Sequence, residues 1–549
     1  MKKKKLFKRI ISIIASLVLV FSSMGFVYGL EDQSQPGYQI AENTDYPDSD
    51  ANYQVTFTYQ SDVALDSVSL VGGFQFYSVD QIQPYLDGET ITAYNAYQYQ
   101  DGMFPTGYDV TTVGQNLSYP MTEVSEGLWT VTLPVPAGEW FYAYDITSSD
   151  TTTRVLDPTN LPLANGDSDR SLMFVGNSSE ALDGQEWIFP RTDGQTGTTE
   201  YVSYQAVDGS MQPLGIYLPY GYNENETYKT FYLSHGGGGN EVEWHEIGAA
   251  DNIMDNLIAA GEVDANTIVV TMDNTYFRWN YTDIKDNLMN NIIPYIEANY
   301  NVSTDPDDRA FAGFSMGAMT TTYMAFHHAD SFGYFGIFSG CNIGNATFAD
   351  GFEYDSSRFY DDDAAEYLQE VYENIVASDD LLNSVVFTMA GDADTAVFAN
   401  GFGYYGAYET IRDWCAMYMT EDNFIDGGLV HGSHDIYTWG QCLYTFAKDV
   451  CWSKDREPVT PEDPGDIDTP DNPGDQNNPD TPNTPDVPDT PTTPSQPGQS
   501  GQVSVATGTT TGNQSAVKTG DDVNYPLYAT MAGIAIVGIL VSLKKKKVF

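Results

Sequence analysis

The segment GFSMG, residues 313–317, constrains this chain more than any other sequence feature. It follows a short apolar run, residues 309–312, and precedes a stretch with a helical pattern, residues 318–328. A serine at the tip of such a strand–turn–helix unit has strained backbone angles, and side chains at the flanking positions would collide with the neighbouring strand and helix. The segment therefore predicts a sharp turn that exposes Ser315 as a nucleophile.

A nucleophilic serine needs a base, and the base needs an acid that orients it. In folds that use this turn, the acid and then the base follow the serine in the chain. Of the six histidines, two precede Ser315 and two lie in the helix that leaves it, so only His431 and His434 remain. We favour His434, because it follows a flexible Gly-Ser pair and precedes a helical stretch, residues 436–449.

The acid is expected just beyond a strand between the serine and the histidine. The apolar run 385–390 has the pattern of a buried strand, and the turn Gly-Asp-Ala-Asp follows it. We favour Asp394 as the acid, with Asp392 as the alternative. Either carboxylate can instead bond its own backbone, which is a common role of aspartate in turns.

Four consecutive glycines, residues 236–239, follow the predicted strand 230–234. Backbone N–H groups at Gly236 and Gly237 can reach a developing oxyanion because no side chain blocks the approach. The matching donor is the amide of Met316, the residue after the nucleophile. A plain flexible loop is the alternative interpretation of the glycine run.

Strand and helix patterns alternate through residues 191–456, which predicts an α/β fold: an α/β-hydrolase domain whose mostly parallel sheet has helices on both faces. The predicted strands are 230–234, 267–272, 310–313, 334–339 and 385–390. The predicted helices lie near 251–260, 283–300, 318–328, 364–377 and 405–419.

Residues 52–190 form a separate N-terminal all-β module in this interpretation. Short alternating strands such as 53–58 and 128–133, with turn signals between them, favour a β-sandwich domain. Residues 30–51 are expected to be a disordered N-terminal segment.

The segment from Tyr201 to Cys451 resembles the family 1 carbohydrate esterases, the esterase-D-like feruloyl and acetyl-xylan esterases. The resemblance rests on YLSHGGGGNEVEW, on NLMNNIIPYIEANYNV ahead of RAFAGFSMG, on the GDAD turn and on GSHDIYTW. It implies a triad of Ser315, Asp394 and His434. It also implies feruloyl or acetyl esters on a plant polysaccharide such as xylan, or its acylated oligosaccharides, as the substrate. This elbow has Ala318 where relatives usually have a second glycine.

The stretch YPMTEVSEGLWTVTLPVPAGEWFYAYDI in the N-terminal module resembles early-set sandwiches related to family 48 carbohydrate-binding modules. Whether this module binds glycan or packs on the hydrolase domain stays open. Near the expected site, Trp244 and Trp279 are candidates for stacking against a ferulate ring, with ordinary packing as the alternative.

The N-terminus has the pattern of an export signal, and a linker follows the predicted hydrolase domain. Residues 1–29 combine a basic start with an apolar run, which is typical of a secretory signal peptide. Residues 457–515 are a Pro/Asp/Thr-rich linker that holds too few apolar side chains to fold.

Residues 516–549 contain Thr-Gly, an apolar span and a basic tail, and this order resembles a sortase sorting signal without the usual Leu-Pro. A simple transmembrane anchor is the alternative. Both interpretations predict an extracellular enzyme anchored on the surface of a Gram-positive bacterium. Sortase and peptidoglycan are then expected partners.

The formal net charge of −54 argues against nucleic-acid binding, which needs a basic surface. The four cysteines permit three disulfide pairings, and buried free thiols are the alternative. No cluster has zinc-like spacing, so we expect no metal and no cofactor.

Two other functions are compatible with the same motifs. One is a serine peptidase or acyltransferase on the same fold. The other is a surface carbohydrate-binding protein with an inactive hydrolase domain, although an intact triad argues against it.

Overall fold

The computed structural model describes residues 36–453 apart from short gaps at 87–88, 90, 107–117, 161–169, 183, 341–342, 356, 359–362, 395 and 398–406. The chain divides into two units, Met1–Arg456 and Glu457–Phe549, and every described residue belongs to the first. The expected signal peptide (1–29), linker (457–515) and sorting signal or anchor (516–549) lie outside the described residues.

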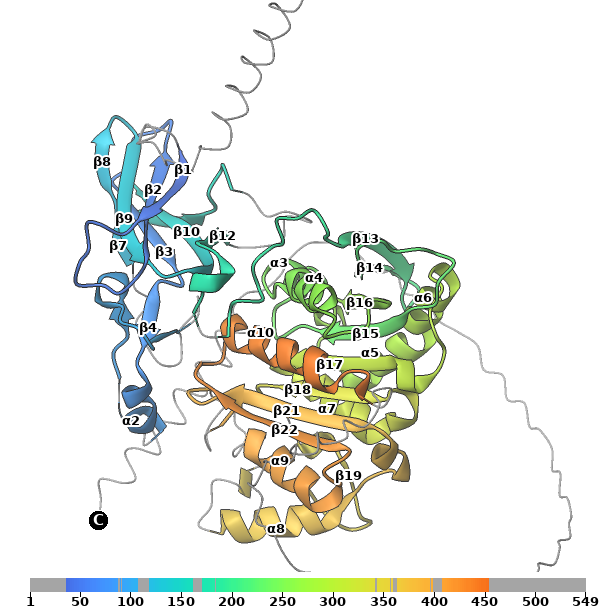
Figure 1. The fold of residues 1–549 in the computed structure, drawn as a ribbon. Helices are drawn as coiled ribbons and strands as arrows, with labels where there is room; N and C mark the ends of the chain where they lie inside the picture. Colours follow the sequence, from blue (N-terminus) through green and yellow to red (C-terminus); the bar gives the residue numbers. More distant parts are fainter. Residues whose placement is uncertain are drawn as a thin grey trace, which may run out of the picture. The chain divides into compact units, whose positions relative to one another are not determined.

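The N-terminal part is an antiparallel β-sandwich, as the alternating pattern predicts (Figure 1). One sheet has the order β1-β2-β9-β8, formed by Gly37–Glu42, Tyr53–Gln60, Leu128–Val135 and Thr122–Ser125. The other has the order β11-β10-β3-β7 with β12 beside β10, formed by Thr151–Val155, Gly138–Ser148, Ser67–Gly72, Ser118–Pro120 and Ser171–Val175. A small sheet, β5-β4-β6, consists of Tyr94–Asn95, Gln75–Tyr77 and Phe104–Pro105, and the short helix α2 spans Ile82–Leu86.

The sandwich begins earlier than the sequence indicates. Strand β1 lies within residues 30–51, which were expected to be disordered, and pairs with β2 from Gly37↔Thr58 to Glu42↔Tyr53. Its apolar side chains at alternate positions, Tyr38 and Ile40, are partly buried against the sandwich core. So short a strand among acidic residues is stabilised by its partner strand, which local sequence does not reveal.

The second part contains an eight-stranded sheet with the order β13-β14-β16-β15-β17-β18-β21-β22. Its strands span Thr198–Gln205, Met211–Leu218, Thr267–Met272, Lys229–Ser234, Arg309–Phe314, Tyr334–Phe338, Val385–Gly391 and Phe424–Val430. Pairing is antiparallel from β13 through β14 to β16 and parallel from there on, which confirms the mostly parallel sheet. A small hairpin-like pair, β19 and β20, joins Thr347–Phe348 to Ile375–Val376.

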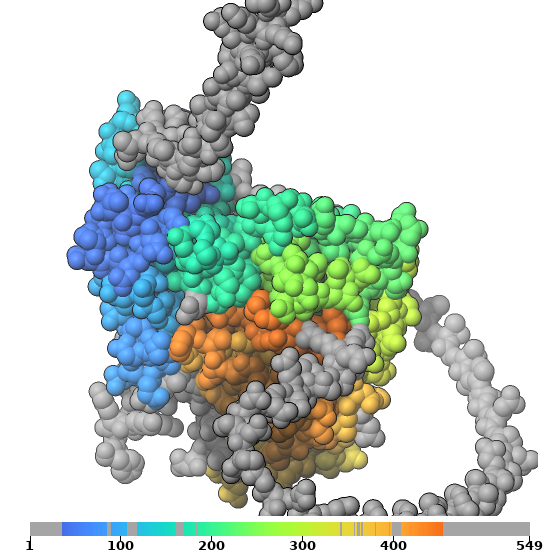
Figure 2. Space-filling model, in the orientation of Figure 1, coloured from blue at the N-terminus to red at the C-terminus, as the bar shows by residue number. Residues whose placement is uncertain are grey.

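Helices cover both faces of this sheet. On one face lie α3, α4 and α10, which span Glu243–Glu246, Ala250–Ala260 and Ile436–Thr445. On the other lie α5, α6, α7, α8 and α9, which span Tyr281–Asn287, Ile293–Asn299, Met316–His327, Ala364–Asn374 and Ala407–Tyr418. In Figure 2 the green side chains of the segment that holds α4 lie beside the orange side chains of α10.

The central strand β17 is buried on both sides, because its side chains alternate between two hydrophobic cores. Phe311 belongs to the core beneath α6 to α9. Ala310, Ala312 and Phe314 belong to the core beneath α4 and α10. The turn that holds Ser315 therefore follows a central strand of the sheet that is packed on both faces.

Cys415, Cys442 and Cys451 are buried, and Cys415 and Cys442 are free thiols, while Cys341 lies outside the described residues. Within the described ranges, the model contains no helix that is both long and apolar enough to cross a bilayer.

Candidate active site

Ser315 forms the turn between β17 and α7 with φ 54° and ψ −119°, a conformation that a non-glycine residue adopts only under strain. Its N–H donates to the Phe338 carbonyl at 3.1 Å. A Cβ on Gly313 would lie 2.7 Å from the Gly317 carbonyl carbon, and a Cβ on Gly317 would lie 2.6 Å from the His235 oxygen. Both glycines are therefore required where the sequence places them.

The structure brings Ser315, Asp394 and His434 together from three separate loops. His434 Nε2 lies 3.0 Å from Ser315 Oγ, and His434 Nδ1 lies 2.7 Å from Asp394 Oδ1. These loops follow β17, β21 and β22, so all three side chains lie at the carboxyl ends of neighbouring parallel strands, where α/β sheets place their sites. The spacing matches a nucleophile, a base and an orienting acid.

The Asp394 carboxylate is fully buried. Burial alone would raise its pKa, but the charge and hydrogen bond of His434 and the Ala396 N–H outweigh burial, so the pKa of Asp394 is lowered. An ionised Asp394 accepts a hydrogen bond from the Nδ1–H group of His434, which leaves the Nε2 lone pair facing the serine hydroxyl.

The glycine run lies against the nucleophile turn. A Cβ on Gly236 would be 3.4 Å from Ser315 Cβ, and a Cβ on Gly237 would be 2.8 Å from Met316 Sδ. Among the described residues, the N–H groups of Gly236 and Gly237 have no hydrogen-bond acceptor. Met316 begins α7, so its N–H has no intrahelical acceptor. These amides are therefore candidate donors to an oxyanion beside Ser315.

The alternative histidine and acid pair with each other and not with the serine. His431 Nδ1 lies 2.6 Å from Asp392 Oδ2, and the His431 side chain is 61% exposed. Its ring also stacks on that of Phe104. The structure thus assembles the preferred set and leaves the alternative set outside it.

The expectation that Trp244 stacks on a substrate is wrong. Its side chain is fully buried, donates its indole N–H to the Ser234 carbonyl at 3.0 Å and packs edge-on against Phe314. Trp279 is partly exposed, has φ 57°, and sits edge-on to the His235 ring, so it remains a candidate for substrate contact. Sequence alone does not distinguish a tryptophan under the glycine loop from one beside it.

A second serine-protease-like constellation was not predicted from the sequence. His245 Nε2 lies 2.9 Å from Thr271 Oγ1, and His245 Nδ1 lies 2.7 Å from Asp251 Oδ1. The Thr271 hydroxyl is buried and donates to the Glu241 carbonyl at 2.5 Å. This hydroxyl is closed to any substrate, so the cluster ties α3 and α4 to β16. In the described part of the chain, no three His, Cys, Asp or Glu side chains are placed to hold a metal ion.

Residues 206–377 match the family model described as "Putative esterase". Two curated relatives match over segments of similar length. The Endo-1,4-beta-xylanase/feruloyl esterase of Xylanibacter ruminicola is 34% identical over 169 residues, which cover 28% of this chain and 23% of the relative. Endo-1,4-beta-xylanase Y of Acetivibrio thermocellus is 36% identical over 160 residues, which cover 27% of this chain and 14% of the relative.

The chain thus spans less than a quarter of the length of these curated relatives. Among solved structures, the CE1 ferulic acid esterase of Anaeromyces mucronatus in complex with ferulic acid aligns with 48% of this chain and 94% of its own, at 19% identity and a TM-score of 0.38. The family match and the relatives support the expected enzyme class, a carboxylic-ester hydrolase.

Proposed function

We propose that residues 191–456 form a serine esterase that hydrolyses feruloyl or acetyl esters on a plant cell-wall polysaccharide such as xylan. The observation that carries the proposal is the continuous line from Ser315 Oγ through the His434 imidazole to the buried Asp394 carboxylate. The enzyme class is supported by the family match.

The first half of the reaction is acyl transfer to the enzyme. His434 Nε2 accepts the Ser315 proton as Oγ attacks the ester carbonyl, and Asp394 stabilises the imidazolium that forms. The imidazolium then donates its proton to the departing sugar oxygen. The carbonyl carbon stays bonded to Ser315 Oγ as an acyl-enzyme.

The developing oxyanion is held by the amide of Met316 and by an amide of the glycine run, at Gly236 or Gly237. Water then attacks the acyl-enzyme, and His434 accepts a proton from that water. Collapse of the second tetrahedral intermediate returns the proton to Ser315 Oγ and releases the acid.

Two observations support the choice of acyl group and polymer. The Xylanibacter ruminicola relative is named for both xylanase and feruloyl esterase activity. Trp279 lies on the loop after β16, edge-on to the His235 ring that precedes the glycine run, and offers a partly exposed aromatic face that suits a ferulate ring.

The proposal includes an extracellular location. The signal-peptide pattern of residues 1–29 favours export, and the pattern of residues 516–549 favours attachment to a Gram-positive cell surface, by sortase to peptidoglycan or by a membrane anchor. The acidic linker, residues 457–515, lies between the esterase and residues 516–549 and would hold the esterase away from the envelope.

The test uses the purified protein and its Ser315→Ala variant. We expect the unaltered protein to hydrolyse 4-methylumbelliferyl ferulate and acetate, to release acid from acylated xylan and to react with a fluorophosphonate probe, and the variant to do none of these. Cleavage of peptide substrates, or acyl transfer to added alcohols in place of water, would favour the peptidase or acyltransferase alternative. Probe labelling without any ester hydrolysis would refute the proposal.

A further inference from the structure

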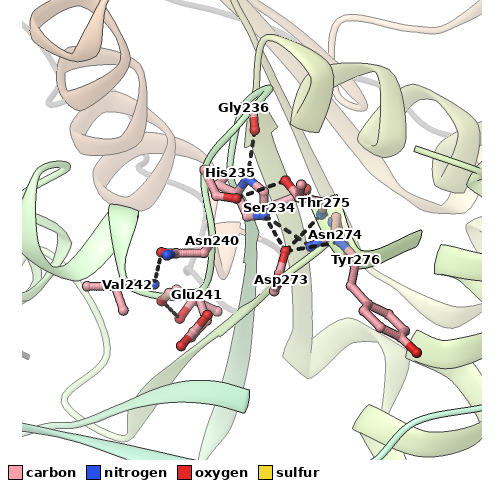
Figure 3. Close-up of polar contacts among 12 residues, drawn as sticks. Ser234, His235, Gly236, Asn240, Glu241, Val242, Asp273, Asn274, Thr275 and Tyr276 are labelled. Atoms are coloured by element: carbon pink, nitrogen blue, oxygen red, sulfur yellow. Dashed lines mark hydrogen bonds and ion pairs between the residues drawn. The ribbon is translucent and has the colours of Figure 1, made fainter. Parts of the chain in front are cut away.

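His235 lies between β15 and the glycine run, and its ring contacts two backbone atoms and the Asp273 carboxylate, whose Oδ1 is 3.7 Å from Nε2 (Figure 3). Nδ1 lies 2.6 Å from the Gly236 carbonyl oxygen, and Nε2 lies 3.0 Å from the Asn274 backbone nitrogen. The side chain is only 1% exposed. None of the steps above uses this histidine.

The two backbone contacts fix the tautomer of the His235 ring. A backbone N–H can only donate, so Nε2 must accept from Asn274 and carries no proton. A carbonyl oxygen can only accept, so Nδ1 must carry the proton and donate it to Gly236. The two backbone contacts therefore assign the Nδ1–H tautomer to the His235 ring.

The Gly236 carbonyl also accepts from the Gly239 N–H at 3.3 Å, so two donors hold it on the side of the His235 ring. A trans peptide is planar, and its N–H points opposite to its C=O. The Gly237 N–H, which shares this peptide, therefore points away from His235. As described above, a Cβ on Gly237 would lie 2.8 Å from Met316 Sδ, and the Gly237 N–H has no acceptor among the described residues.

The loop after β16 supports the same arrangement from both ends of the glycine run. Asn274 donates its side-chain amide to Ser234 Oγ at 2.7 Å, and Thr275 Oγ1 donates to the Gly239 carbonyl at 2.8 Å. Figure 3 shows these residues around the His235 ring. Without such contacts, two successive glycines would leave their shared peptide free to rotate, because glycine tolerates nearly every backbone conformation.

We propose that His235 is a positioning residue that locks the Gly236–Gly237 peptide so that the Gly237 N–H faces the oxyanion. A rotated peptide would present its carbonyl oxygen there and would repel the negative charge. This inference rests on the proposed ester hydrolysis, and it assigns the second donor of the oxyanion hole to Gly237.

The test compares three substitutions in the full chain. His235→Phe removes both backbone contacts of the ring, His235→Asn keeps a donor near the Nδ1 position, and His235→Gln places its amide near the Nε2 position instead. The matched control is His245→Asn, which alters a buried histidine that contacts Thr271 and Asp251 and lies outside the catalytic set.

With 4-methylumbelliferyl acetate, we expect His235→Phe to lower kcat about 100-fold with KM changed less than about threefold, the effect of losing one oxyanion donor. Inhibition by phenylboronic acid should weaken by a similar factor, because its serine adduct has an anionic tetrahedral boron with one oxygen in the oxyanion position. His235→Asn should restore most of the activity and His235→Gln should not. The control should keep kcat within about threefold.

A rise in KM at constant kcat, an unchanged boronate affinity, equal losses in the asparagine and glutamine variants, or an equal loss in the His245 control would each overturn the inference. If His235→Phe fails to fold by circular dichroism, the asparagine and glutamine pair carries the same comparison. An unaltered protein that cleaves no ester refutes the proposed function itself, whereas an active protein whose boronate affinity ignores these variants refutes only the role of His235.

Discussion

Asp435, the residue after His434, should make the free energy of unfolding depend on pH. Its carboxylate caps α10 by accepting the Thr438 N–H at 3.1 Å and also accepts the Ser433 hydroxyl at 2.8 Å. Burial, reinforced by the nearby Asp394 carboxylate, raises the pKa of Asp435 from its ordinary value of 3.8 to about 6.

A raised carboxyl pKa means that the folded protein binds this proton more tightly than the unfolded chain does. The contribution is fully favourable below about pH 4 and is lost as the pH rises through about 6. The rise in pKa corresponds to about 3 kcal/mol at pH 7. Asp435→Asn keeps an N-cap acceptor but never ionises, so it should escape this loss.

The assay is urea unfolding of the unaltered protein and the variant from pH 4 to pH 8. We expect the free energy of unfolding of Asp435→Asn, relative to the unaltered protein, to increase by up to about 3 kcal/mol between pH 4 and pH 7. Asp305→Asn is the matched control, because Asp305 also caps a helix but is exposed, and its difference should stay within about 0.5 kcal/mol at every pH. A difference for Asp435→Asn that is flat with pH, or that falls as the pH rises, would refute the reasoning.

Three further predictions concern the site and the thiols. Gly236→Val should reduce kcat nearly as much as Ser315→Ala, because even a Cβ at Gly236 lies 2.9 Å from Phe314 Cδ2; ester hydrolysis by both variants checks this, and near-normal turnover by the valine variant contradicts it. His434→Asn should lower kcat about 10⁴-fold or more, whereas His431→Asn should keep kcat within about threefold. Ester hydrolysis measured as a function of pH checks this, and equal losses in the two variants would contradict the assignment of His434 as the base. Cys415 and Cys442 should resist iodoacetamide in the native protein and react in urea, because burial raises the pKa of both thiols. Peptide mass spectrometry that finds either of them alkylated in the native protein would contradict this.

The elements around Ser315 were predictable because each leaves a strong local signal. The apolar strands, the flanking glycines and the order of acid and base along the chain are all visible in the sequence, and the structure brings those residues together. The tie between His235, Gly236 and Asn274 was not predictable, because it joins residues about 40 positions apart through backbone atoms that carry no residue identity.

Failures of prediction follow from the same physics. Strands β1, β13 and β14 have mixed polar patterns and depend on antiparallel partners, so their own sequences indicate them weakly. Trp244 was misassigned because a tryptophan next to a functional loop can face either the solvent or the core. Its burial against Phe314 and Phe338 is decided by tertiary packing.

The two hydrophobic cores pack against both faces of β17, so the sequence of this strand is more constrained than that of the loops around the site. The nucleophile follows a strand whose side chains are buried in both hydrophobic cores, whereas the other site residues lie on separate loops. Changes in those loops would therefore alter the surroundings of the site without disturbing the strand that carries the serine. We therefore expect proteins with this fold to vary more in substrate specificity than in catalytic mechanism.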